Sequence, residues 1–399
     1  MMSFNKELEN YTKELNAARR DKNIELALER AVTSFRNNLA RVLEKHPDTP
    51  VLAEEVRGIK EKARENNKEL LVRAREAIEN NKGKTYFASD REAAIQIVRE
   101  IIGTGKVIVK SKSMLGEEIG IRKALEETGN EVWETDLGEF ILQLKDERPM
   151  HILTPSIHIP KEQVAEIFSK FFGREIPEEI QDLVKVVREF LREKYFQADF
   201  GITGANVVAA ETGQLIIIEN EGNARLCSAA PPVHIVIVGL EKLVPTFSEA
   251  MKTAEVTWRY ASYTVPGYVN IISGPSKTGD IEKEITYGAH GPKELHVIFV
   301  DNGRSKIMED KDFGQALNCL RCGGCMFECP VFQITAGHYG KTYLGGIGSI
   351  WTVFTDGGLE KAAPLIYTCL RCGRCQEQCP MRIEVPTMVG KLRKEIVYQ

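Results

Sequence analysis

The sequence of 399 residues predicts an α/β domain that lies between two helical regions. Three observations support this fold class. Residues 5–82 are rich in Glu, Lys, Arg, Ala and Leu; β-branched runs then alternate with helical stretches; and eight of the nine cysteines lie near the C-terminus. We therefore expect an N-terminal helical region over residues 1–84, an α/β domain over residues 85–304, and a mainly helical cysteine-rich domain over residues 305–399.

The N-terminal region contains few helix breakers, with no glycine before Gly58 and only Pro47 and Pro50. An apolar stripe at helical spacing runs through Leu26, Leu28, Val32, Phe35, Leu39 and Leu43. A second helix is predicted from about Ala53. We expect a helical arm that packs on the rest of the chain or on a partner, with its charged faces in solvent.

The central region alternates strands and helices, as chains with a largely parallel sheet do. Strands are predicted at residues 107–110, 132–136, 151–154, 213–219, 234–239 and 295–300. Helices are predicted at residues 92–102, 117–128 and 178–195. Some antiparallel pieces should modify this sheet. No G-x-G-x-x-G or G-x4-G-K-[ST] loop follows a strand, so the sequence does not support a nicotinamide, flavin or ATP site.

Polar clusters follow several of these strands, and ligands of open α/β sheets bind beyond the carboxyl ends of strands. Together the clusters predict a small-molecule pocket with two kinds of side chain, cationic or amide groups that bind a carboxylate or phosphate and acidic groups for proton transfer. The candidates are Lys110, Lys112, Asn206, Glu211, Glu221 and Arg225. The alternative is ordinary turn chemistry, because Gly, Asn, Asp and Ser also dominate turns.

We expect structural rather than catalytic or metal-binding roles for the histidines and for the isolated cysteine. His151, His158, His234, His290, His296 and His338 lack paired metal-ligand spacing, so each is expected to be a hydrogen-bonded structural residue. Cys227 is expected to be a small buried side chain, with a reactive thiol as the alternative.

The C-terminal cysteines form two runs with the spacing C-x2-C-x2-C-x3-C-P, which bacterial two-cluster ferredoxins use to hold [4Fe-4S] clusters. In this motif the cysteine before proline binds the other cluster. The sequence thus predicts one cluster on Cys319, Cys322, Cys325 and Cys379, and a second on Cys369, Cys372, Cys375 and Cys329. Zinc would leave a third evenly spaced cysteine in each run without a role, and a disulfide framework expects a short secreted chain.

The long insert between the two runs and the helical spacing of residues 385–397 argue against a compact β-rich ferredoxin. The runs and the exit from the second one resemble the helical two-cluster modules of succinate dehydrogenase and heterodisulfide reductase iron-sulfur subunits.

Composition excludes several classes of protein. A net charge of −4 does not suit a nucleic-acid partner, and no apolar stretch is long enough to span a membrane. The first residues contain no apolar signal region, so we expect a cytoplasmic protein with reduced thiols.

Several stretches together resemble the lactate-utilisation domain: residues 110–114, 134–143, 202–206, 210–213, 220–223, 231–235, 239–242, 290–292 and 301–304. Followed by the two cysteine runs, they resemble the iron-sulfur subunit of the bacterial three-protein L-lactate utilisation complex. This resemblance implies an α/β domain similar to the sugar-phosphate isomerase and CoA-transferase fold. It also implies two partners, a cysteine-rich subunit with CCG domains and a second subunit with a lactate-utilisation domain.

The expected function is therefore that of an electron-transfer subunit of a cytoplasmic 2-hydroxy-acid dehydrogenase that oxidises L-lactate to pyruvate, without catalysis by this chain alone. Relatives commonly continue beyond the second run, whereas this chain stops at Gln399, which keeps open an adaptor for another, heterodisulfide-reductase-like oxidoreductase. A third hypothesis is an α/β domain that binds an acyl or sugar phosphate, with the clusters as a redox sensor.

Overall fold

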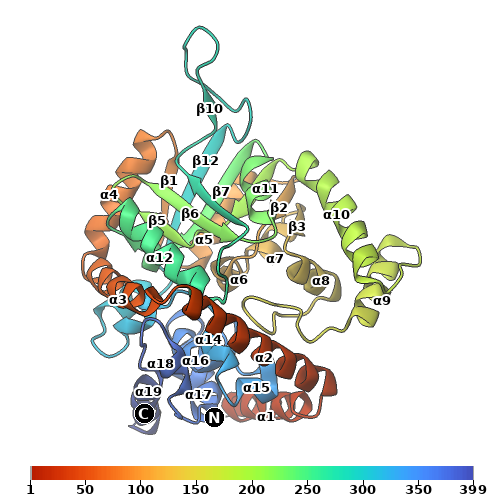
Figure 1. Ribbon diagram of the computed structural model, residues 1–399, viewed down its shortest axis with the longest axis vertical. Coiled ribbons are helices and arrows are strands. Elements are labelled where there is room, and N and C mark those ends of the chain that lie inside the picture. Colours follow the sequence, from red (N-terminus) through yellow and green to blue (C-terminus); the bar gives the residue numbers. More distant parts are fainter. Residues whose placement is uncertain (1, 399) are drawn as a thin grey trace.

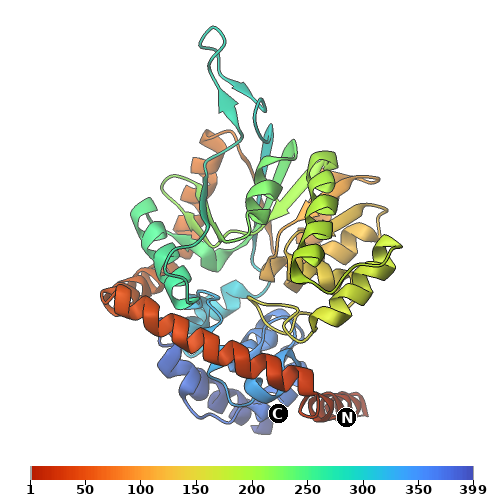
Figure 2. The same cartoon turned by 45° about the vertical axis from the view of Figure 1, so that its right-hand side comes forward.

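The computed structural model describes residues 2–398 and begins with a helical arm (Figure 1). Its helices are α1 (Met2–Ala18), α2 (Lys22–Lys45), α3 (Thr49–Glu65) and α4 (Asn67–Asn80). Asp21 caps α2 by accepting hydrogen bonds from the backbone of Asn23 and Ile24. Figure 2 shows α2 lying along the boundary between the α/β domain and the C-terminal helices. This helix contacts α12 (Phe247–Tyr260), α14 (Gly324–Phe327) and α15 (Phe332–Thr335). The arm therefore packs on the rest of the chain, which is one of the two arrangements that we expected, the other being packing on a partner.

The centre of the α/β domain is a six-stranded, fully parallel sheet. In spatial order its strands are β1 (Lys84–Ala88), β12 (Glu294–Val300), β7 (Val233–Gly239), β4 (Phe200–Thr203), β2 (Val107–Lys110) and β3 (Glu131–Glu134). The helices between them are α5 (Arg91–Ile102), α6 (Met114–Ile119), α7 (Ile121–Glu126), α8 (Leu137–Lys145), α9 (Lys161–Phe172), α10 (Ile180–Gln197) and α11 (Asn223–Ala229). Apolar clusters cover both faces, which explains the uninterrupted β-branched runs of the central strands.

A smaller mixed sheet packs beside the first one, in the order β8 (Leu243–Val244), β5 (Val207–Ala209), β6 (Gln214–Glu219) and β9 (Tyr268–Ile272). It supplies the antiparallel pieces that the sequence predicted. A short 3-10 helix, η1 (Leu240–Lys242), connects β7 to β8, and α12 (Phe247–Tyr260) follows. The hairpin of β10 (Lys277–Thr278) and β11 (Thr286–Tyr287) projects from the far end of the domain (Figure 1).

The C-terminal region is helical, as predicted. It contains α13 (Arg304–Glu309), η2 (Gly314–Asn318), α14 (Gly324–Phe327), α15 (Phe332–Thr335), η3 (Ala336–His338), α16 (Gly345–Thr355), α17 (Gly358–Thr368), α18 (Arg374–Gln378) and α19 (Val385–Tyr398). Up to Tyr398 its only β-type pairing is an isolated bridge between Gly340 and Leu344.

Two local predictions were wrong. Residues 151–154 form a bend rather than a strand. The ring of His151 accepts hydrogen bonds from the backbone N–H groups of Leu153 and Thr154, at 3.1 and 3.3 Å, and these bonds hold the backbone in the bend. The predicted helix over residues 117–128 is interrupted by Gly120, whose φ of 69° is left-handed and separates α6 from α7. The other predicted strands and helices are present, within a few residues at their ends.

One hydrophobic core joins the α/β domain to the C-terminal helices. It combines Val207 and Ile216 of the smaller sheet with Leu317, Trp351 and other apolar residues of the C-terminal region. A tethered domain would have a separate core. The shared core therefore holds the cysteine runs in a defined position relative to the sheet.

A buried ion network spans the same junction. The guanidinium of Arg304, which is fully buried, donates two hydrogen bonds to Glu118 at 2.8 and 2.9 Å and one to Glu241 at 2.6 Å. The hydroxyl of Tyr343 also donates to Glu118. Three parts of the chain, α6, η1 and the C-terminal region, are thus tied together by charge as well as by apolar contact.

The close approach of β4 to α11 leads to a first testable prediction. A Cβ atom on Gly201 would overlap the backbone carbonyl of Cys227, whereas a Cβ on Gly58 in α3 would meet nothing within 4 Å. We expect Gly201→Ala to lower the free energy of unfolding by about 3 kcal/mol, because neither backbone segment can yield easily. Gly58→Ala should raise it by about 0.5–1 kcal/mol, since alanine loses less backbone entropy in a helix. Thermal unfolding of both variants would check this; equal melting temperatures would contradict it.

Candidate metal centre and adjoining cavity

The two cysteine runs adopt the same backbone turn. Arg321 and Arg371, which precede the second cysteine of each run, have φ values of 63° and 55°. Gly323 and Gly373, which follow it, have φ values of 79° and 86°. A non-glycine residue in this left-handed region costs about 1–2 kcal/mol and is retained where the surrounding structure requires it. The repeated sequence therefore forms the same locally strained backbone turn twice, and each turn directs its cysteines into one cavity.

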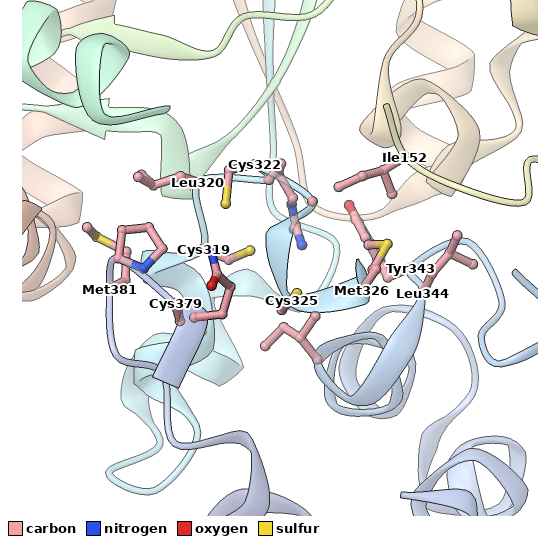
Figure 3. Close-up of a pocket in the computed structure, with 15 residues that line it drawn as sticks. Ile152, Cys319, Leu320, Cys322, Cys325, Met326, Tyr343, Leu344, Cys379 and Met381 are labelled. Atoms are coloured by element: carbon pink, nitrogen blue, oxygen red, sulfur yellow. The ribbon is translucent and has the colours of Figure 1, made fainter. Parts of the chain in front are cut away.

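The first cavity, which we call site I, is lined by Cys319, Cys322, Cys325 and Cys379. Figure 3 shows the labelled cysteines of the first run with Cys379 arriving beside them from the second run. Apolar side chains, among them Ile152, Met326 and Ile347, fill much of the remaining wall.

The second cavity, site II, is lined by Cys369, Cys372, Cys375 and Cys329. It lies nearer the surface than site I: Cys372 is exposed, and the neighbouring Leu370 is 66% exposed. Each cavity thus brings together three cysteines of one run and the fourth of the other run, which is the grouping that the motif predicts.

The donor set of each site fits a cubane cluster, because four cysteines line each cavity. Among residues 2–398, no group of three or more His, Cys, Asp or Glu meets the geometry of a site for one metal ion. The four thiolates of a cubane each bind a different iron and so lie farther apart than four thiolates round one zinc.

The pKa values of several cysteines at both sites are raised. Burial, together with neighbouring cysteines, raises the pKa of Cys322 to about 12 and that of Cys379 to about 11. Burial and the other thiolates of site II likewise raise the pKa of Cys375 to about 12. Without a cation these cysteines would be neutral thiols at neutral pH; the iron of a cubane would supply the positive charge that keeps them as thiolates.

One wall of site I contains a cation that is stacked on aromatic rings. The guanidinium of Arg321 lies over the rings of Tyr343 and Trp351, at 4.2 and 4.0 Å from their centres. Its Nη2 is buried without a hydrogen-bond partner, and the nearest carboxylate oxygen, on Glu241, is 3.9 Å away. Arg321 is therefore held by stacking, and some of its donor capacity remains unused.

A larger cavity of about 300 Å³ adjoins site I, and we call it the junction cavity. It lies at the carboxyl ends of β2, β4 and β7 and is closed on one side by Arg321, Cys322 and Tyr343. Cys322 lines both the junction cavity and site I. A molecule in this cavity would consequently lie against a cysteine of site I.

Three of the six pocket residues predicted from the sequence line the junction cavity: Lys112, Asn206 and Glu221. The ammonium of Lys112 donates to Asp136 at 2.7 Å and to the carbonyl of Leu153 at 3.0 Å. The side-chain oxygen of Asn206 accepts the backbone N–H of Ile218 at 2.9 Å. Burial raises the pKa of Glu221, and the charge of Asp136 adds to this.

The other three predicted residues lie elsewhere. Lys110 is buried and pairs with Glu134 at 2.8 Å and Glu117 at 3.1 Å; burial opposes its charge, but these carboxylates outweigh it and raise the pKa of Lys110. Glu211 accepts the backbone N–H of Phe247 at the start of α12. Arg225 is exposed, with its guanidinium 4.3 Å from the centre of the Tyr268 ring.

Cys227 is fully buried, as expected, with its sulfur 3.3 Å from the hydroxyl oxygen of Thr135, and burial raises its pKa to about 12. Of the histidines considered, five make hydrogen bonds through the ring, whereas His290 is exposed and makes none among the described residues.

Sequence reasoning missed Lys242, Arg321 and Tyr343 as residues of the junction cavity. A signal for Lys242 was available, because η1 directly follows the predicted strand at residues 234–239 and so lies at a strand's carboxyl end. No comparable signal places Tyr343, which reaches the cavity from the insert between the two cysteine runs.

None of the helices in residues 2–398 combines the length and the apolar character needed to cross a lipid bilayer.

Comparison with protein families finds two matches in this chain. Residues 71–300 match the LUD domain, and residues 315–383 match the 4Fe-4S dicluster domain. Together these segments include both sheets, the junction cavity and all eight cysteines of sites I and II.

Curated proteins also resemble the chain over most of its length. Lactate utilization protein B of Shouchella clausii is 39% identical over 81% of this chain and 67% of its own length. The protein of the same name from Bacillus subtilis is 38% identical over 86% of this chain and 72% of its own. An uncharacterized electron transport protein of Escherichia coli, YkgF, is 37% identical over 70% of this chain and 58% of its own. A crystal structure of a DUF162 family protein from Deinococcus radiodurans, 16% identical, covers 59% of this chain with a TM-score of 0.33.

Proposed function

Because this chain belongs to the LUD domain family and carries a 4Fe-4S dicluster domain, we propose that it is the iron-sulfur electron-transfer subunit of an L-lactate-oxidising system. In this proposal sites I and II each hold one [4Fe-4S] cluster. The names of the similar proteins suggest lactate as the substrate of the system. The oxidation of L-lactate to pyruvate would be completed with partner subunits, a CCG-domain protein and a second LUD-domain protein, in the cytoplasm.

The single observation that carries the proposal is the exchange of cysteines between the two runs. Cys379 lies at site I and Cys329 at site II, so each run contributes to both cavities. Such an exchange holds two clusters close together. Cys325 of site I and Cys375 of site II are near enough for one thiolate to influence the other's pKa. Short distances of this kind favour electron transfer between the clusters.

The surroundings of the two sites support different roles. Site I lies beside the junction cavity, whereas site II lies near exposed side chains such as Leu370 and Tyr367, which is 51% exposed. Exposed basic residues, Arg371 and Arg374, also flank site II. In our proposal the first cluster exchanges electrons with the molecule bound inside the protein, and the second exchanges them with a partner protein.

Anaerobic isolation tests the proposal. The protein should contain about eight iron and eight sulfide per chain, in keeping with two cubanes. L-lactate added together with the partner subunits should bleach the visible absorption of the clusters, and a sample without the partners should remain coloured. Stoichiometric zinc without charge-transfer absorption would contradict the cluster assignment. Full cluster content with bleaching only by another donor would contradict the lactate assignment alone.

A further inference from the structure

The junction cavity contains two cations whose hydrogen-bonding capacity is not used within the protein. Lys242 lines the cavity, and its ammonium makes no hydrogen bond or ion pair with any described residue. Arg321 lines the same cavity as well as site I, and its guanidinium makes no hydrogen bond with any described residue; Nη2 itself is buried, 3.9 Å from Glu241. A cationic side chain that borders a cavity without a partner in the protein can donate to an acidic ligand there.

None of the four carboxylates that line the cavity, Glu221 included, accepts a hydrogen bond from Lys242 or Arg321 among the described residues. Asp136 is occupied by Lys112 at 2.7 Å. Glu219 accepts the backbone N–H groups of Ala224 and Arg225, each at 2.8 Å, at the start of α11. Glu241 is bound by Arg304 and lies 3.9 Å from Arg321. The two cations thus remain available to a ligand.

The same carboxylates limit the charge of that ligand. Asp136, Glu219, Glu221 and Glu241 all line the cavity, so a polyanion would meet their repulsion. A single carboxylate suits two cationic side chains that line the same cavity, since each can form a charge-assisted hydrogen bond with it. The apolar walls, which include Met114, Leu153 and Val238, would take a short carbon chain.

The position of the cavity links it to the clusters. It lies at the carboxyl ends of parallel strands, where α/β sheets bind ligands, and its volume falls within the range of small-molecule sites. Cys322 forms part of its wall and is also a predicted ligand of the first cluster. An occupant next to Cys322 would change the surroundings of that cluster and not those of the cluster at site II.

We infer that the junction cavity binds a small organic monocarboxylate, of the class of 2-hydroxy and 2-oxo acids, with its carboxylate on Lys242 and Arg321 beside Cys322. This inference rests on the proposed function, which supplies the substrate class. It adds a location to that function: the LUD domain of this chain would hold the acid against the first cluster.

The test uses cluster-loaded protein and pyruvate as the probe. Calorimetric titration should show saturable binding of one pyruvate per chain, and pyruvate should shift the electron paramagnetic resonance spectrum of one reduced cluster only. Lys242→Gln should weaken binding about tenfold to a hundredfold, because it removes a charge-assisted hydrogen bond. Lys242→Arg, which keeps the cation, should restore most of the affinity.

Lys277→Gln provides the matched control, since it removes the same charge from an exposed strand of the β10–β11 hairpin, away from the cavity. It should bind pyruvate as the wild type does. If the clusters are present and reducible but pyruvate neither binds nor alters either spectrum, the inference fails and the electron-transfer proposal stands. Equal affinity in wild type and Lys242→Gln would also overturn it. Absence of clusters would overturn both.

Discussion

The Cys379→Ala variant is expected to lose the cluster at site I, although Cys379 belongs to the second cysteine run. The reason is geometric: Cys379 lines the cavity of Cys319, Cys322 and Cys325, while the rest of its run lines the other cavity. Iron content should fall from about eight to about four per chain. Cys329→Ala should have the converse effect and remove the cluster at site II.

Electron paramagnetic resonance spectra of three variants test which cluster is lost. Cys379→Ala and Cys322→Ala should both keep only the cluster at site II and so have the same spectrum. Cys372→Ala should keep only the cluster at site I and have a different spectrum. Cys227→Ala serves as the control and should keep its full iron content, because Cys227 is buried beside Thr135 and lines neither site. If Cys379→Ala instead resembles Cys372→Ala, the ligands are not exchanged between the runs.

The second large effect is expected from the ion network at the junction. Arg304→Met would leave the carboxylates of Glu118 and Glu241 buried without their cation. Removing one partner of a buried ion pair costs about 3–5 kcal/mol, because the remaining charge is neither solvated nor paired. We expect a loss of this size in the free energy of unfolding, measured by anaerobic urea denaturation.

Two other variants calibrate the effect. Lys84→Met removes a cation from the exposed ion pair with Glu294, and it should cost at most about 1 kcal/mol. Arg304→Lys keeps the charge but loses the paired hydrogen bonds to Glu118, so its effect should be intermediate. A loss for Arg304→Met no larger than that for Lys84→Met would show that the network does not stabilise the junction.

Much of the fold could be predicted from local patterns. The β-branched runs at residues 107–110, 234–239 and 295–300 became central strands because a parallel strand covered on both faces has a continuous apolar sequence. Seven strands were not predicted: β1, β4, β5, β8, β9, β10 and β11. Of these, β5 and β8 contain only two or three residues, which is no clear signal. At residues 151–154 an apolar run was taken for a strand, and the hydrogen bonds of the buried His151 ring produced a bend instead.

The site was predictable to different degrees. The cysteine spacing predicted eight residues and their grouping, because a short turn gathers three cysteines of one run and the motif assigns the fourth from the other run. For the junction cavity, polar residues after strands identified Lys112, Asn206 and Glu221 but also Lys110, whose charge is occupied by Glu134 and Glu117. The sequence does not reveal that pairing, since those carboxylates lie on other elements.

The two repeated turns, their cysteines, and the alternation of strand and helix follow from local sequence, because each depends on residues close together in the chain. The ion pair of Arg304 in α13 with Glu118 in α6, and the cavity that Lys242 of η1 lines together with Arg321 of the first run, arise from the packing of distant segments. This arrangement depends on the core shared by the smaller sheet and the C-terminal helices. That packing places the first cluster site against the carboxyl ends of the parallel strands, where its cysteine borders a cavity.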